Sequence, residues 1–334
     1  MLNLHFLNVG HGDCKIIQND ETKHISMIDI NMSDDMDDTT TNELLEEAFS
    51  ILGQRYRRLY ETCQISGSQA LTEAKYAVKL QNPINYCIEN NLTNIFRFIS
   101  THPHMDHISG IADLYSKLSV HNTWILRNNF KASSLSASQQ IDWDFYTSLR
   151  DTTDYETQYG YIVRPMEKDF NDFWNIDDIE ILAPNSELLQ IAKKKNNPNI
   201  MSYVLLLTYG KHKIIFGADA EKETWEYVTN TYASKITDIS ILDASHHGRD
   251  TGYYQPAVKL MSPNMLLFLL EKNHKQMHQI SIGSILIMFY QHVGMEILNL
   301  SWSKMVLVQL KLNMIIDLTP FSKPTTQVFA CVAV

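Results

Sequence analysis

One short run constrains this chain more than any other feature: His102-Pro103-His104-Met105-Asp106-His107. Most of its side chains are imidazoles or carboxylates, which suit zinc, manganese or iron. The run follows an apolar stretch, 95–100, that predicts a buried strand, and it precedes residues 108–118, which predict a helix. Alternate residues at a strand end point the same way, so His102 and His104 can bind one ion. Asp106 and His107 then turn towards a second ion. The alternative, a polar loop of solvated histidines, does not account for so many ligand-type side chains together.

Two later segments can supply the further ligands that this run needs. Asp219 follows the apolar stretch 213–216, and the pair His246 and His247 follows the apolar stretch 238–242. Taken alone, the aspartate could equally be a helix cap, and a histidine pair is more often structural. All three clusters, however, lie at the carboxyl ends of predicted strands, the edge where open α/β sheets build their sites. This shared placement predicts one composite metal site.

Strands and helices alternate along the chain, which predicts a layered α/β architecture. We expect strands at 2–8, 14–18, 25–30, 95–100, 122–126, 161–164, 179–182, 201–208, 213–216 and 238–242. Helices are expected at 108–118, 143–149 and 221–229, with a helical insert, read as a solvated cap, over 33–90. Some aromatic side chains could line a pocket, although packing in a core or cap is the more usual role: Trp143, Phe145, Tyr146 and Trp174.

Charge and composition limit the classes of function. The 334-residue chain has a formal net charge of -10, which argues against a nucleic-acid coat protein because phosphate binding normally needs a basic face. A nucleic-acid enzyme stays compatible, since bound cations supply local positive charge. The sequence has no signal-peptide pattern and no apolar run long enough for a membrane span. The four cysteines are too far apart for a zinc knuckle, so we expect reduced thiols in a cytoplasmic protein.

The motifs resemble those of the metallo-β-lactamase superfamily. STHPHMDHISGI matches its HxHxDH signature, FGAD its metal-bridging aspartate and SHHG its last histidine motif. The opening NVGHGDC, the segment MIDI and the motif order are similar to one branch, the metallo-hydrolase domain of the bacterial competence (DNA-uptake) channel protein and its free-standing relatives. The resemblance covers about residues 1–264 apart from the insert. It implies an αββα sandwich, with two half-sheets back to back, helices outside and metals at one edge.

The resemblance also implies a role for each motif residue. The implied ligands are His102 and His104 for a first ion, Asp106, His107 and His246 for a second, and Asp219 as the bridge. His247 is less expected as a ligand and would position the substrate, while Asp29 would brace the metal loop from behind. His11 and Asp13 fall in the turn that borders the site in this branch, where a structural role is an equal alternative.

The implied metal is Zn²⁺, with Mn²⁺ as the alternative. Many superfamily members place a further histidine ligand before the bridging aspartate, but the matching strand end here, 181–184, carries Ala183. Because that ligand is missing, occupancy by one or by two ions stays open.

The chemistry implied is hydrolysis by a metal-bound hydroxide. Asp106 or Asp219 would orient the nucleophile, and His247 could stabilise developing charge. The favoured substrate is a phosphodiester, either a small molecule or a nucleic acid. Two alternatives stay open: hydrolysis of a thioester, lactone or lactam, and a non-catalytic binding or regulatory protein that uses the helices of 33–90 as its partner surface. The sequence identifies no protein partner and no membrane contact.

The character of the sequence changes after Asn264. Residues 265–334 contain no arginine and few acidic residues, and no regular strand-and-helix pattern is evident. When residues 265–297 are back-translated into codons and read in a shifted frame, codon degeneracy permits a different amino-acid sequence. That shifted sequence contains a strand, a glycine turn and an Asn-Gly hairpin. We therefore expect an out-of-frame tail that lacks the closing strands of the second half-sheet and exposes an unpaired edge. Its histidines are then incidental: His274, His278 and His292.

Overall fold

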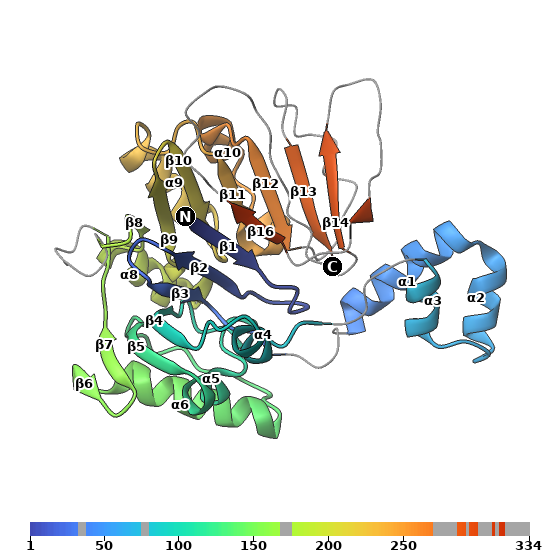
Figure 1. Cartoon of the computed structure of the whole chain (residues 1–334), viewed down its shortest axis with the longest axis horizontal. Coiled ribbons are helices and arrows are strands. Elements are labelled where there is room, and N and C mark those ends of the chain that lie inside the picture. The colour runs from blue at the N-terminus through green and yellow to red at the C-terminus, as the bar shows by residue number, and fades with distance from the viewer. Residues whose placement is uncertain are drawn as a thin grey trace.

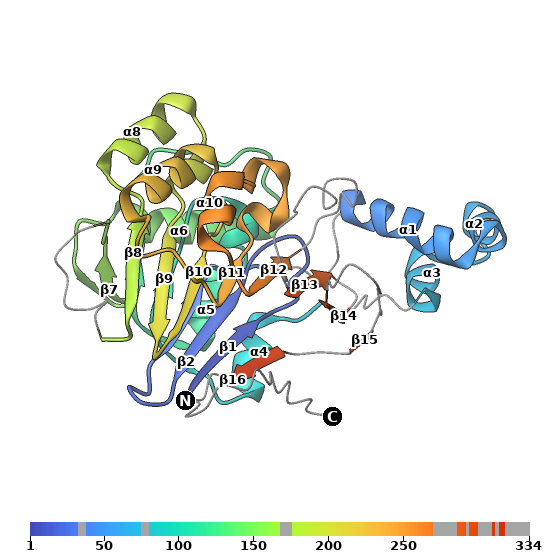
Figure 2. The same ribbon diagram turned by 90° about the horizontal axis from the view of Figure 1, so that it is seen from above.

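The computed structural model describes residues 1–32, 38–74, 80–167, 176–269, 286–291, 294–299, 309–310 and 314–317. Two eight-stranded sheets form the centre of this part of the chain, and helices cover their outer faces (Figures 1 and 2). Every described helix is too short or too polar to cross a lipid bilayer.

The first sheet has the strand order β16-β1-β2-β3-β4-β5-β7-β6. Its strands are β1 (Leu2–Phe6), β2 (Lys15–Asn19), β3 (Ile25–Ile28), β4 (Asn94–Ile99), β5 (Ser119–Trp124), β6 (Glu156–Thr157), β7 (Gly160–Val163) and β16 (Met314–Asp317). β3, β4, β5 and β7 run parallel, so their carboxyl ends meet at one edge. All four residues of β3 are buried, as expected for a parallel strand that is covered on both faces.

The second sheet has the order β15-β14-β13-β12-β11-β10-β9-β8. Its strands are β8 (Ile179–Ala183), β9 (Val204–Tyr209), β10 (His212–Phe216), β11 (Ile241–Asp243), β12 (Met265–Leu269), β13 (Leu286–Gln291), β14 (Gly294–Asn299) and β15 (Gln309–Leu310). β10, β11, β12 and β13 are parallel. β8 has the direction of β10, because two antiparallel pairings through β9 separate them. The carboxyl ends of β8, β10 and β11 therefore share one edge.

Apolar side chains join these layers. One core cluster contains residues of both sheets, among them Ile99, Trp124, Leu205 and Ile214, so the sheets pack against each other. A second cluster lies between the first sheet and three helices, α4 (Pro83–Glu89), α5 (Ile111–Lys117) and α6 (Ala137–Asp151). Three further helices contribute to the first cluster and cover the second sheet (Figure 2): α8 (Ser186–Lys195), α9 (Lys222–Tyr232) and α10 (Gln255–Met261). The predicted αββα sandwich is confirmed.

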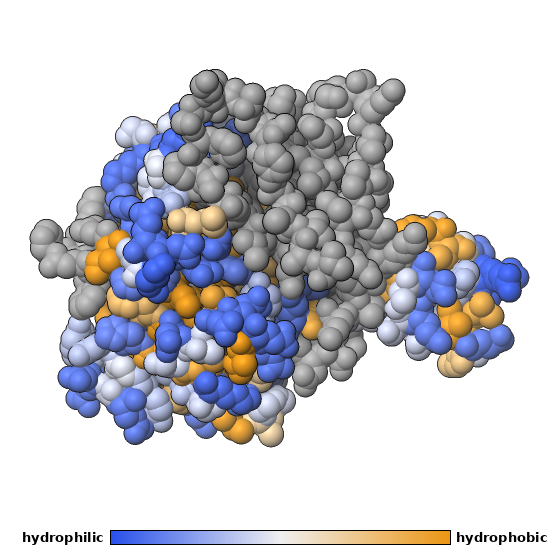
Figure 3. Space-filling model, viewed as in Figure 1, coloured by the Kyte–Doolittle hydropathy of each residue, from blue (hydrophilic) through white to orange (hydrophobic). Residues whose placement is uncertain are grey.

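The helical segment between β3 and β4 has two parts. α1 (Asp38–Leu52), α2 (Gln54–Glu61) and α3 (Gly67–Glu73) project from the sandwich and bury a small core of their own (Figure 1). Figure 3 shows apolar side chains on the visible face of these helices, and Ile51 is 62% exposed. α4, by contrast, buries Ile84 and Cys87 in the core of the sandwich. The expected insert over 33–90 therefore includes a helix that packs as part of the sandwich.

Most predicted elements are found with ends shifted by a few residues, but α8 and α10 were not predicted. Three of the aromatic residues that could have lined a pocket, Trp143, Phe145 and Tyr146 of α6, instead pack in or against the core cluster between α6 and the first sheet. Trp174 lies outside the described residues.

The described part of the tail differs from expectation. We expected the closing strands of the second sheet to be missing, but β12 extends that sheet from β11, with β13, β14 and β15 beyond it. β16 extends the first sheet by pairing with β1. That expectation is wrong for these strands, because their backbone continues both ladders. The out-of-frame origin of the tail stays a prediction, and its three histidines lie outside the described residues.

Candidate metal centre

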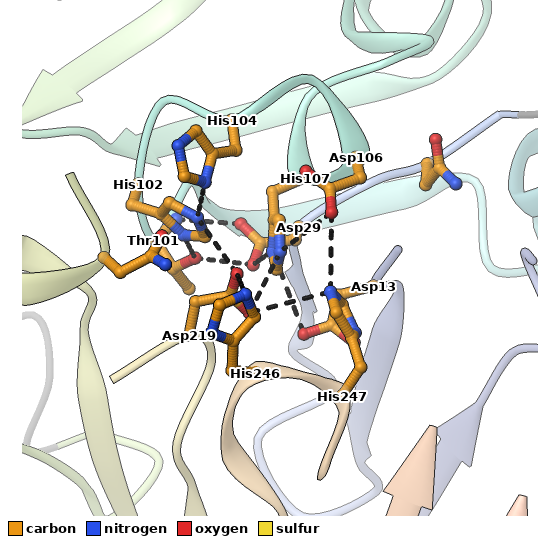
Figure 4. Close-up of polar contacts among 12 residues, drawn as sticks. Asp13, Asp29, Thr101, His102, His104, Asp106, His107, Asp219, His246 and His247 are labelled. Atoms are coloured by element: carbon orange, nitrogen blue, oxygen red, sulfur yellow. Dashed lines mark hydrogen bonds and ion pairs between the residues drawn. The ribbon is translucent and has the colours of Figure 1, made fainter. Parts of the chain in front are cut away.

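The strand ends of both sheets meet at one edge of the sandwich and bring the predicted ligands together (Figure 4). The loops after β3 and β4 approach from the first sheet, and the loops after β10 and β11 approach from the second. The side chains that converge there are those predicted from the motifs: His102, His104, Asp106, His107, Asp219, His246 and His247.

The first group of possible ligands consists of His102, His107 and Asp219, and all three are buried. Asp219 Oδ1 lies 3.2 Å from His107 Nε2, and Asp219 Oδ2 lies 3.5 Å from His102 Nε2. His104 approaches the same ring nitrogen of His102, with its Nδ1 3.0 Å from His102 Nε2. Each oxygen of the Asp219 carboxylate therefore faces a different imidazole.

A second group consists of His11, Asp106 and His247. Asp106 Oδ2 lies 3.2 Å from His11 Nε2 and 3.4 Å from His247 Nε2. His247 Nε2 is also 3.7 Å from Asp219 Oδ1, so the Asp219 carboxylate stands between the two groups. The resemblance pairs Asp106 with His107, but Asp106 Oδ2 lies 3.9 Å from His107 Nε2, farther than Asp219 Oδ1.

Both members of the histidine pair reach the centre, from opposite sides of Asp219. His246 Nε2 lies 3.6 Å from Asp219 Oδ2, and His246 Nδ1 is 2.6 Å from the hydroxyl of Thr251. His247 is buried and faces the other carboxylate oxygen. The sequence motif alone favoured His246 as the ligand of the pair, whereas this geometry offers a donor atom from each.

The backbone around the centre is strained. Asp29, Ala218, His246 and His247 all have positive φ angles, between 42° and 55°, which are uncommon for residues other than glycine. Such conformations cost free energy and cluster at functional sites. Gly12 allows the turn before β2 to approach the metal loop, residues 102–107, because a Cβ at Gly12 would collide with the carbonyl oxygen of Asp106.

Asp29 holds the metal loop from behind. Its carboxylate accepts hydrogen bonds from the backbone N–H and the hydroxyl of Thr101, at 2.8 and 2.6 Å. It also lies 2.8 Å from His107 Nδ1, which directs the other ring nitrogen of His107 towards Asp219. This is the bracing contact that the resemblance implies.

A buried ion cluster that we did not predict supports the second group. Lys15 Nζ lies 2.6 Å from Asp13 Oδ2 and 2.8 Å from Asp243 Oδ2, and all three residues are buried. Asp13 Oδ1 is 3.5 Å from His247 Nδ1, so the cluster reaches the second group through Asp13. The available signal was a lysine next to the apolar pair Ile16 and Ile17 in the predicted strand 14–18.

Charge pairing outweighs burial at several of these groups. Burial opposes the charged form of His247, but the carboxylates of Asp219 and Asp13 raise its pKa to about 10. Burial likewise opposes ionisation of Asp219, yet the imidazoles of His107 and His247 hold its pKa well below its usual value. At His104 the balance is reversed, because burial together with His102 outweighs the carboxylates of Asp106 and Asp219 and lowers its pKa to about 3.

The residues present fit a metal ion. Among the residues that the structure describes, three buried atoms that face one another lack a hydrogen-bond partner: His107 Nε2, Asp219 Oδ1 and His247 Nε2. Leaving such groups unsatisfied is costly, and a divalent cation satisfies imidazole nitrogen and carboxylate oxygen together. Ala183 ends β8 at the same edge, so that position supplies no imidazole ligand.

Comparisons with known proteins add three distant likenesses. No family model and no curated protein matches this chain. Among solved structures, Igni18, a metallo hydrolase of Ignicoccus hospitalis, is 10% identical over 80% of this chain and 83% of its own, with a TM-score of 0.41. The metallo-β-lactamase fold protein YhfI of Bacillus subtilis is 12% identical over 83% of this chain and 91% of its own, with a TM-score of 0.39. A protein of Parabacteroides distasonis described as a metal-dependent hydrolase is 13% identical over 86% of this chain and 92% of its own, with a TM-score of 0.38.

The topology itself identifies the fold. Two mixed sheets pack face to face, helices cover both outer faces, and a His/Asp centre lies where the parallel strands end. The chain has the metallo-β-lactamase fold.

Proposed function

We propose that this protein is a metal-dependent hydrolase whose substrate is a phosphodiester. The observation that carries the proposal is the Asp219 carboxylate, which belongs to the first His/Asp group, contacts His247 of the second, and has a buried oxygen without a hydrogen-bond partner among the described residues. A carboxylate in this position suits a bridge between two ions or a ligand to one. Similarity to the competence-type branch, carried by NVGHGDC and the motif order, and a cytoplasmic location are parts of the same proposal.

The side chains divide into three proposed tasks. His102, His104 and His246 would hold an ion on one side of Asp219, and His107, Asp106 and His247 would hold one on the other; Zn²⁺ fits these donors, with Mn²⁺ as the alternative. Bound divalent cations supply hydroxide at neutral pH and neutralise charge on phosphoryl oxygens. Asp106, whose side chain is 22% exposed, would orient the attacking water.

Substitution of Asp219 tests the proposal. Asp219→Ala removes the carboxylate of the first group that also contacts His247 of the second, and His104→Ala removes a donor beside His102. Because even outer partners of metal ligands change activity by about 10–100-fold, we expect Asp219→Ala to lose at least about 100-fold in hydrolysis of bis(4-nitrophenyl) phosphate, together with bound metal. Metal content, measured by mass spectrometry, and circular dichroism accompany the assay.

Matched controls separate the site from general effects. Asp154→Ala and His121→Ala remove the same residue types from exposed positions and should change neither metal content nor rate. Undiminished diesterase activity in Asp219→Ala would refute the proposal. Hydrolysis of thioesters or lactones without diesters would replace the substrate class, and stoichiometric metal without any hydrolysis would favour a binding role.

A further inference from the structure

Three of the possible metal ligands share one ring orientation, in which Nε2 faces Asp219 and Nδ1 faces a neighbouring oxygen. The Nδ1 contacts are His102 with the hydroxyl of Thr101 at 3.1 Å, His107 with the carboxylate of Asp29 at 2.8 Å, and His246 with the hydroxyl of Thr251 at 2.6 Å. Histidines that bind metal almost always donate their other ring N–H in this way, because that hydrogen bond fixes the tautomer and the orientation of the ring.

His247 has the same orientation, and a carboxylate from the turn before β2 lies behind it (Figure 4). Its Nε2 lies 3.4 Å from Asp106 Oδ2 and 3.7 Å from Asp219 Oδ1, whereas its Nδ1 lies 3.5 Å from Asp13 Oδ1. Nδ1 of His247 and Oδ1 of Asp13 have no hydrogen-bond partner among the residues that the structure describes. An imidazole that binds a cation through Nε2 carries its proton on Nδ1, where Asp13 is the acceptor that faces it.

Asp13 is itself fixed on two sides. Lys15 Nζ lies 2.6 Å from Asp13 Oδ2, and this pairing leaves Oδ1 to face His247. The backbone N–H of Asp13 donates to the carbonyl oxygen of Asp106 at 3.1 Å, so the turn is bonded to the metal loop. A paired lysine favours the charged carboxylate, and a charged acceptor makes a hydrogen bond about twice as strong as a neutral one.

The other imidazole near Asp13 has a closer partner. Asp13 Oδ2 lies 3.8 Å from His107 Nδ1, but Asp29 Oδ2 lies 2.8 Å from the same nitrogen. The effect of Asp13 on the centre should therefore pass through His247.

We propose that Asp13 is a positioning residue that aligns His247 as a metal ligand. This inference rests on the metal binding of the proposed function and adds a residue to it. A purely structural role in the turn, the alternative that the sequence left open, would act on the fold as a whole. A positioning role acts through His247 alone, and this difference can be measured.

A double-mutant cycle makes that measurement. Asp13→Asn keeps the shape of the side chain but removes its charge, and His247→Ala removes the imidazole. Competition with a chelator gives the Zn²⁺ affinity of the parent, both single variants and the double variant. Each single variant should bind Zn²⁺ about 10–100-fold more weakly than the parent. The double variant should bind as weakly as His247→Ala and no weaker, because the effects of residues that act through one another do not add.

Asp243→Asn is the matched control. It also removes a buried carboxylate from Lys15, whose Nζ lies 2.8 Å from Asp243 Oδ2, but Asp243 forms no ion pair with an imidazole in the described part of the chain. This variant should keep the Zn²⁺ affinity of the parent. Circular dichroism and melting temperatures of all variants accompany the measurement.

Three results overturn the inference: equal Zn²⁺ affinity in Asp13→Asn and the parent, losses that add in the double variant, and an equal loss in Asp243→Asn. Should Asp13→Asn not fold, NMR of the imidazole nitrogens in the Zn²⁺-loaded parent decides. The proton of His247 is expected on Nδ1, and a proton on Nε2 overturns the inference. A parent that binds Zn²⁺ without hydrolysing diesters refutes the proposed function alone, whereas a parent that binds no Zn²⁺ refutes both.

Discussion

At the scale of single residues, buried charge is the feature with the largest consequences. Lys15, Asp13 and Asp243 form an ion cluster inside the sandwich that joins β2 to the end of β11. Removing one partner from a buried ion cluster leaves uncompensated charge, which costs far more than the cluster contributes when complete. These residues therefore make the candidate metal centre dependent on a buried lysine that is not one of its possible ligands.

Lys15→Met should lower the free energy of unfolding by about 3–5 kcal/mol, because two buried carboxylates lose their counter-ion. Urea denaturation measures the change. Asp243→Asn is the matched control, since it leaves the pair of Lys15 and Asp13 intact and should cost much less. Equal stability of Lys15→Met and the parent would show that the cluster is not stabilising the fold.

The pH dependence follows from His247. Its pKa is raised from 6.5 to about 10 in the metal-free protein, so the stability from its charge pairing is complete below pH 6.5 and is lost as the pH rises through about 10. A bound cation must displace this proton, so metal affinity should increase with pH over the same window. Melting temperatures of metal-free and metal-loaded protein at several pH values measure both effects. A metal-free protein that gains stability towards pH 10 would contradict this assignment.

Asp29→Asn tests the bracing contact behind the loop. An amide cannot supply two carboxylate oxygens to Thr101 and His107 together. We expect metal affinity to fall by about 10–100-fold with the fold retained. Chelator competition gives the affinity, and Asp154→Asn, at an exposed position, serves as control. Unchanged affinity would mean that the metal loop holds its shape without Asp29.

At the scale of elements, the projecting helices and the sandwich have separate cores. α1 and α3 bury Leu45, Phe49 and Leu71 among themselves, whereas Ile84 of α4 packs in the sandwich. The chain after the projecting helices is already attached to the body at Gln81, whose backbone N–H donates to the carbonyl oxygen of Asn8 at 2.7 Å. The helices α1–α3 are thus an addition to the sandwich.

Replacing residues 33–79 by a flexible linker should leave metal content and diesterase activity nearly unchanged. Ile84→Ala is the contrasting variant, because truncating this side chain in the sandwich core should cost about 2–5 kcal/mol. Thermal melts and metal analysis of both proteins make the comparison. Loss of metal on removing the helices would show that they complete the centre.

At the scale of the whole molecule, the tail determines how far the second sheet extends. β12 pairs with β11 directly beside the histidine pair, and the backbone N–H of Ala244 donates to the carbonyl oxygen of Leu267 at 2.7 Å. Leu267 is buried in the core between the sheets. The first residues after Asn264 therefore contribute to the fold whatever the origin of the remainder.

The nucleotide sequence across the Asn264 codon tests the out-of-frame tail. We expect a change of reading frame there, and a protein made from the restored frame should melt at a higher temperature and aggregate less, because its closing strands would follow strand and turn patterns. Limited proteolysis of the present chain should cut the tail first. A tail as resistant as the sandwich would contradict the prediction.

Much of the fold could be predicted because its strands have local signatures. Apolar runs such as those of β4 and β10 are long enough to identify alone. α8 was missed although Asn185 caps its start and three lysines end it. Its mixture of polar and apolar residues is typical of a loop. Its apolar residues are recognised as a buried face only from their packing against the sheet. The strands after Asn264 were missed because their sequence has no regular pattern.

The sequence by itself determined which side chains could bind metal, since imidazoles and carboxylates followed predicted strands in a known motif order. Only the tertiary structure decided how they pair: Asp219 contacts imidazoles of both groups, both histidines of the pair lie near it, and Lys15 pairs with the Asp13 that contacts His247. The reason is physical. Residues next to each other in the chain share local signals, but distances between loops of different strands depend on sheet register and on the packing of one sheet against the other.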